Sequence, residues 1–258
     1  MTCTILIATL VCASLASGAA AIAAQSGGAP GAVSFELSET RSAPGHAPAM
    51  RFAFQTVEIH QCATLEAALL VRGNTIVLGP FSLRALKGPC PPTVTPAFGS
   101  RTVSVANGRY TLSVVNGDTG AYDVGVSDSL ITVEATRAAR GATTAHAASL
   151  RIQPNTFALT CGSPREEPTF CPGVVRGLGS VPGVTVVNLP SGAQGWQQQA
   201  NGFWVNEPTR YFRFASETAL SAAEMLITAS ARSVPKNAGF GLAIAVWDGR
   251  DFYAQSGQ

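Results

Sequence analysis

Short runs in which apolar and polar residues alternate follow one another along most of the chain, each closed by Gly, Pro, Asn or Asp. Such period-two runs are typical of β-strands with one buried face. Residues 33–38 and 51–59 show the pattern, and we expect a bulge in the second. Residues 65–71 and 75–79 flank turn-forming residues at 72–74, which predicts a hairpin.

The clearest alternation runs through residues 107–136, where three runs around Leu112, Val124 and Val133 are separated by turn signals. They predict an antiparallel meander with one apolar face, which must pack on a second sheet that the earlier strands can supply. With the GRYTLSV run at 108–114, the pattern over 33–136 resembles immunoglobulin-like modules of secreted bacterial proteins. This resemblance implies a β-sandwich over residues 33–140.

The second half of the chain, residues 155–258, predicts another β-rich module, with a boundary between 140 and 155. Ser221 and Glu224 fit a capping box, so residues 222–232 form either one short helix or a strand. A closing hairpin is expected with Asp248-Gly249 as its turn. The fold class that we predict is therefore all-β, with two β-sandwich-like modules and room for one short helix in the second.

The N-terminal 35 residues carry no charged side chain, since the first is Glu36. An apolar stretch at 4–15 and an A-x-A pattern at 21–23 resemble a secretory signal peptide over residues 1–24. The alternative is an uncleaved membrane anchor. Contact with a membrane is expected only through this leader, if it is retained.

Four cysteines follow the leader, and they allow three pairings. We expect the local ones, Cys62–Cys90 and Cys161–Cys171, because each joins residues within one half of the chain. A four-cysteine zinc site is not expected, since no C-x-x-C pair occurs. Disulfides form in oxidising compartments, so a secreted or periplasmic location is predicted.

The charge of the chain and the motifs that it lacks limit the ligands and cofactors that we expect it to bind. A net charge of +2, with only 12% charged residues, does not suit a nucleic-acid partner. No cofactor motif is present, and neither a cofactor nor a metal is expected. The three histidines, His46, His60 and His146, lack metal-ligand spacing. Asp118, Asp123 and Asp128 recur every five residues and could hold calcium, although turn formation explains them more simply.

Aromatic residues concentrate in the C-terminal quarter, which holds all three tryptophans, Trp196, Trp204 and Trp247. Amide side chains surround the first two, and rings flanked by amides suit sugars, whose C–H faces stack on the ring. The alternative is that most of these aromatic residues fill a β core. The predicted ligand-binding residues are Trp196, Trp204, Gln198 and Asn206.

The sequence thus favours a secreted, non-enzymatic binding or structural module whose partner is a glycan or a cell-envelope component. No catalytic residue is assigned. One alternative is a glycan-active hydrolase that uses carboxylates of the C-terminal half, and another is an adhesion or assembly subunit that uses sheet edges. The candidate carboxylates are Glu207, Glu217, Glu224, Asp248 and Asp251.

Overall fold

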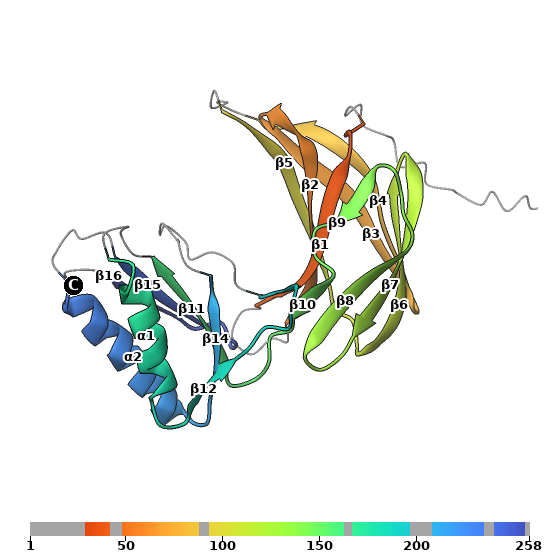
Figure 1. Ribbon diagram of the computed structural model, residues 1–258. Coiled ribbons are helices and arrows are strands. Elements are labelled where there is room, and N and C mark those ends of the chain that lie inside the picture. The colour runs from red at the N-terminus through yellow and green to blue at the C-terminus, as the bar shows by residue number, and fades with distance from the viewer. Residues whose placement is uncertain are drawn as a thin grey trace, which may run out of the picture.

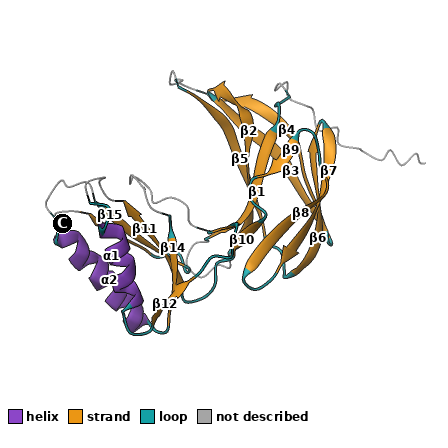
Figure 2. Ribbon diagram, in the orientation of Figure 1, coloured by secondary structure: helices purple, strands orange, loops and turns teal. Residues whose placement is uncertain are grey.

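A computed structural model describes residues 29–41, 48–87, 93–162, 167–196, 208–234 and 240–255. Within them the chain forms two β-sheets, and both helices lie against one face of the second sheet (Figures 1 and 2). The predicted mostly-β, sandwich-like class is confirmed. The leader, Cys90, His46, Gln198, Trp204, Asn206 and Glu207 lie outside the described residues.

The first module is built on an eleven-stranded sheet, sheet A, which curls around one apolar core. Its predicted hairpin at residues 65–79 and its meander are confirmed, as is the bulge between Gln55 and Ile59. In spatial order its strands are β13 (Ala193–Gln194), β10 (Ala148–Leu150), β8 (Leu130–Arg137), β7 (Asp118–Val126), β6 (Gly108–Asn116), β4 (Thr75–Ala85), β3 (Ala63–Arg72), β5 (Val94–Val103), β2 (Ala49–Gln61), β1 (Val33–Thr40) and β9 (Ala142–Thr144).

The meander packs on the earlier strands, as its apolar face requires. The ring of Phe35 on β1 meets that of Tyr122 on β7 edge-on, with centroids 5.0 Å apart. Parallel pairing of β4 with β6 joins the two halves, so the sandwich is one continuous sheet. Beside β1, the Ala145 amide donates a hydrogen bond to the Phe35 carbonyl, and the Ser149 hydroxyl donates one to the Leu37 carbonyl.

The second module is built on sheet B, in which Phe157, Phe212 and Phe214 stack on one face. The helices cover this face and bury their own apolar side chains against it. The strand order is β12 (Val184–Val187), β14 (Arg210–Phe214), β11 (Thr156–Gly162), β15 (Gly241–Val246) and β16 (Asp251–Gln255), and the helices are α1 (Phe170–Gly179) and α2 (Glu217–Arg232).

Helix α2 contains the predicted helical stretch, but it begins five residues earlier than the capping box indicates. The N-cap is Ser216, whose hydroxyl accepts a hydrogen bond from the Ala219 amide at 3.3 Å. Ser221 lies inside the helix because burial of Leu220 and Ala223 extends the apolar face toward Ser216. Neither helix of the described chain is long and apolar enough to cross a membrane.

Helix α1 is absent from the sequence-based prediction, because three glycines interrupt it and lower its helix propensity. Its buried positions, Cys171, Val174 and Leu178, nevertheless recur at helical spacing. Gly177 permits the approach of α2, since a Cβ there would lie 3.2 Å from a methyl group of Leu226. The helix therefore depends on tertiary packing.

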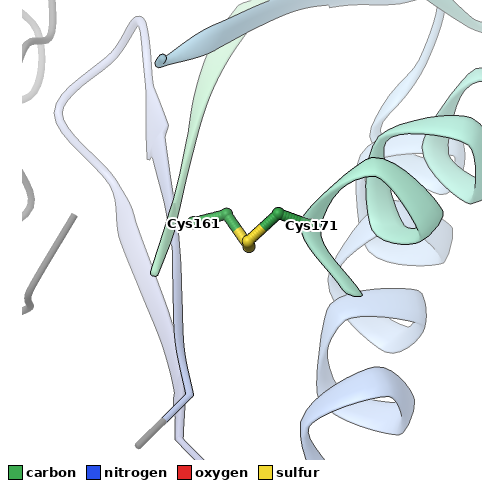
Figure 3. Close-up of a disulfide and its surroundings, with 2 residues drawn as sticks. All are labelled: Cys161 and Cys171. Carbon is green, nitrogen blue, oxygen red and sulfur yellow. A yellow bond between two sulfur atoms is a disulfide. The ribbon is translucent and has the colours of Figure 1, made fainter. Parts of the chain in front are cut away.

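The disulfide between Cys161 and Cys171 joins β11 to α1, as Figure 3 shows. Both cysteines are buried, and this predicted pairing is confirmed. Cys62 is also disulfide-bonded. Because Cys90 lies outside the described residues, its pairing with Cys62 stays a prediction.

Candidate functional site

The end of strand β1 fastens the first module to the second. Glu39 is 4% exposed, and its carboxylate accepts hydrogen bonds from the Arg151 guanidinium and from the Ile152 amide, each at 2.7 Å. Two residues later, Arg41 donates to the carbonyls of Val246 and Arg250 at 3.1 and 3.2 Å. These contacts hold the connection between the sheets and the β15–β16 turn against β1.

We call this contact region between the modules, made by Glu39, Arg41, Arg151 and the β15–β16 turn, the joint. Arg41 also brings Trp196 into it. Its Nη1 lies 2.7 Å from Oδ1 of Asp251, and its guanidinium carbon lies 5.9 Å from the centroid of the Trp196 ring. Because the Arg41 side chain is only 17% exposed, solvent screens these contacts less than at an open surface. An arginine that pairs with a carboxylate and lies over an indole is well suited to such a joint.

Strand β13 delivers Trp196 by returning to sheet A, where it pairs with β10. The indole is 8% exposed and packs against the ring of Tyr211 at 5.6 Å. Gly195 permits this contact, since a Cβ there would lie 1.8 Å from the Tyr211 hydroxyl. Trp247 is partly buried on the same apolar cluster. Neither of these two tryptophans is an open stacking platform, and whether Trp196 binds a ligand stays a prediction.

Beside the joint lies a cleft of about 710 Å³ that is mostly polar. Its floor is the outer face of β1 and β2, and its walls are the 145–146 segment and Gly195–Trp196. The lining side chains include Glu36, Arg51, Gln55, Phe98, His146 and Trp196.

The charges of the cleft divide into paired and available groups. Glu39 and Arg41 line it but are engaged in the joint. Glu36 lies 3.9 Å from Nε2 of His146. Arg51 is exposed and forms no ion pair within the described structure. The cleft therefore offers one guanidinium, one carboxylate and an imidazole, without a strong excess of either charge.

Phe98 on β5 supplies an exposed ring, because 57% of this residue is open to solvent. It is the cross-strand partner of Gln55 on β2, and both side chains line the cleft. Directly paired residues have Cβ atoms roughly 5 Å apart, so the ring and the amide are neighbours. An aromatic ring beside an amide is the arrangement that the sequence predicts around Trp196 and Trp204, and here β2 and β5 provide it.

Three polar atoms beside this cleft are buried without a hydrogen-bond partner among the described residues: both polar atoms of the Gln194 side chain and Nε1 of Trp196. Each such atom costs about 1–3 kcal/mol relative to a paired one. The segment that forms one wall of the cleft is therefore held by packing and by Arg41 rather than by hydrogen bonds of its own side chains.

The candidate hydrolase carboxylates that the structure describes are engaged by arginine, apart from Glu224. Arg250 binds Glu217 at 2.7 and 3.0 Å, and it also binds Asp248. The hydrogen bond from Arg250 lowers the pKa of Glu217. Burial raises the pKa of Asp248, but hydrogen bonds from Arg250 outweigh it and leave that pKa lowered. Burial raises the pKa of Glu224.

The predicted metal candidates do not gather. Asp118 accepts a hydrogen bond from the Arg140 amide, and Asp128 accepts one from Asn107. Asp123 lies on another surface, in a groove on the outer face of β6–β8. Across the described ranges, no group of three His, Cys, Asp or Glu side chains is placed to hold a metal ion.

Comparisons of the chain with family models, with curated proteins and with solved structures find no match. The resemblance of residues 33–136 to immunoglobulin-like modules accordingly stays a prediction.

Proposed function

We propose that this protein acts outside the cytoplasm as a non-enzymatic binding module, and that it holds a glycan or another hydroxyl-rich component of the cell envelope in the cleft beside the joint. The observation that carries this proposal is the exposed ring of Phe98 next to Gln55 on the floor of a polar cleft, together with Arg51, which forms no ion pair with any described residue.

The chemistry of the cleft suits a pyranose. The C–H face of a sugar stacks on an aromatic ring, and its hydroxyls exchange hydrogen bonds with amide, guanidinium and carboxylate groups. The near balance of charge favours a neutral or zwitterionic ligand over a polyanion. Because the described candidates Glu217, Asp248 and Asp251 pair with arginines, the geometry supports retention of a glycan rather than its cleavage.

Export is supported by the buried Cys161–Cys171 disulfide, because such bonds persist in oxidising compartments. The leader-like sequence of residues 1–24 agrees with this location.

Affinity electrophoresis through gels that contain soluble cell-wall polysaccharide, together with a glycan array, tests the proposal. The unaltered protein is expected to be retarded and to release no reducing ends. Phe98→Ala should abolish the retardation, because it removes the stacking surface. Tyr253→Ala is the matched control, since Tyr253 is half exposed and does not line the cleft.

Three results would overturn the proposal. Equal retardation of the unaltered protein and of Phe98→Ala would show that the ligand binds outside the cleft. Release of reducing ends, lost on Glu224→Gln, would identify a hydrolase instead. No retention of any glycan would leave only a structural or assembly role.

A further inference from the structure

A second hollow lies in the other module, beside the Cys161–Cys171 disulfide. It has a volume of about 230 Å³, between strand β11, helix α1 and the start of strand β14. Its floor is apolar. The residues of this floor are Leu159, Cys161, Cys171, Pro172, Val175 and Pro208.

Two arginines form the polar part of this hollow, Arg176 from α1 and Arg210 from β14. Both are exposed, and neither guanidinium makes an ion pair or a hydrogen bond in the part of the chain that the structure describes. The described lining contains no acidic residue. Among the described residues, nothing neutralises the two guanidiniums, so they are available to an anion.

The first turn of α1 adds to the positive potential of the hollow. A helix N-terminus carries a partial positive charge, which an acidic side chain in the first turn usually offsets. Helix α1 has no acidic residue in its first turn, and its N-cap, Thr169, makes no side-chain capping bond. Cys171 and Pro172, in that same turn, line the hollow.

From this combination we propose that the hollow beside the disulfide is a binding site for a small anionic amphiphile, a carboxylate attached to a short alkyl or aryl group. The guanidiniums bind the carboxylate by charge-assisted hydrogen bonds, and the apolar floor takes the tail. The volume accommodates a tail of several carbon atoms but not a long lipid chain. This site is independent of the cleft in the first module and does not rest on the glycan proposal.

Isothermal titration of the purified protein with octanoate, octanol and acetate tests the site. Octanoate carries both the charge and the tail, and it is expected to bind at least tenfold more tightly than either of the others. The double variant Arg176→Gln/Arg210→Gln should weaken octanoate binding by at least tenfold. Arg232→Gln is the matched control, because Arg232 is an exposed arginine at the end of α2 that does not line the hollow. It should bind octanoate as the unaltered protein does.

A second variant separates the apolar floor from the charges. Val175→Trp fills the hollow and leaves both arginines in place, so octanoate affinity should fall to the level of acetate. A thermal melt of each variant checks that it is folded, and the arginine variants change only exposed side chains. Equal affinity for octanoate and acetate, or unchanged octanoate binding in the double variant, would overturn the proposal. Failure of the protein to bind octanoate would overturn it too, whatever the cleft binds.

Discussion

The two modules close their apolar cores by different means. In the first, a single sheet curls until β1 faces β7, and aromatic pairs such as Phe35–Tyr122 meet across the core. In the second, one face of a five-stranded sheet is covered by two helices, and a disulfide ties α1 to the central strand. The first module is thus held by long-range strand pairing. The second relies on a cross-link, because its glycine-rich helix α1 is a weak helix former.

The largest expected effect of a single substitution is Phe35→Ala in the first module. Phe35 is buried and packs against Tyr122, so its loss should lower the free energy of unfolding by about 3–5 kcal/mol. Trp196 lies in the joint and Trp247 in the second module, so their fluorescence reports these regions, whereas circular dichroism reports both sheets. Urea unfolding should therefore show a larger shift by circular dichroism than by fluorescence. Coincident, equal shifts would show that the modules unfold as one unit.

Removal of the disulfide by Cys161→Ala/Cys171→Ala tests the stability of the second module. The bond closes a loop of ten residues, which corresponds to about 2–3 kcal/mol in the chain-entropy description. The urea midpoint followed by tryptophan fluorescence should therefore fall. The unfolding transition of the first module should not shift. The matched control is Ser230→Ala, in the last turns of α2. A shift confined to the first module would contradict this division.

Glu39→Gln breaks the joint rather than either core. The substitution keeps the shape of the side chain but removes the charge that Arg151 binds, and Glu39 is almost fully buried. We expect a loss of about 2–3 kcal/mol, below the usual range for a fully buried pair because a fifth of the Arg151 side chain is exposed. Glu66→Gln, which removes an exposed partner of Arg84, should change the unfolding free energy by less than about 1 kcal/mol. Similar losses for the two variants would show that Glu39 is not a special contact.

The smallest effect is the dependence of the second module on acidic pH. The pKa values of Glu217 and Asp248 are lowered in the folded protein, so the unfolded chain takes up protons first when the pH falls below their usual values of 4.5 and 3.8. Stability from these two groups is present above that range and is lost as the pH falls through the lowered pKa values. Glu224 acts in the opposite direction, because burial raises its pKa and protonation relieves the cost.

Arg250→Gln tests this sign. The variant should have a lower urea midpoint than the unaltered protein at pH 6, and the gap between the two midpoints should be smaller at pH 3, which lies below the usual pKa values of both carboxylates. A gap of the same size at both pH values would mean that Arg250 stabilises the module by packing alone.

Local patterns in the sequence were sufficient to predict the hairpins, the meander and the Cys161–Cys171 pairing, because each joins residues that are close along the chain. They were insufficient for the parallel pairing of β4 with β6 and of β1 with β9, which only the closed sheet determines. Helix α1 was missed because its glycines mask a helical spacing of buried residues.

The residues of the candidate site, too, could be predicted only where the pattern is local in the sequence. The sequence directs attention to Trp196, since an aromatic residue among amides is visible locally. Phe98 and Gln55 lie more than forty residues apart, and only the register of β2 with β5 makes them neighbours. Glu39 near the end of β1 and Arg41 just beyond it have the spacing of ordinary surface residues, and nothing in the sequence indicates that they contact the second module.

The central claim is that Glu39 and Arg41 hold the modules in one arrangement and so form the cleft. Small-angle X-ray scattering of the purified protein tests it most directly, because interdomain contacts of this kind usually permit relative motion. We expect the unaltered protein to scatter as one rigid arrangement, and Glu39→Gln/Arg41→Ala to have a larger radius of gyration while each module stays folded. A flexible profile for the unaltered protein, or identical profiles for both, would contradict it.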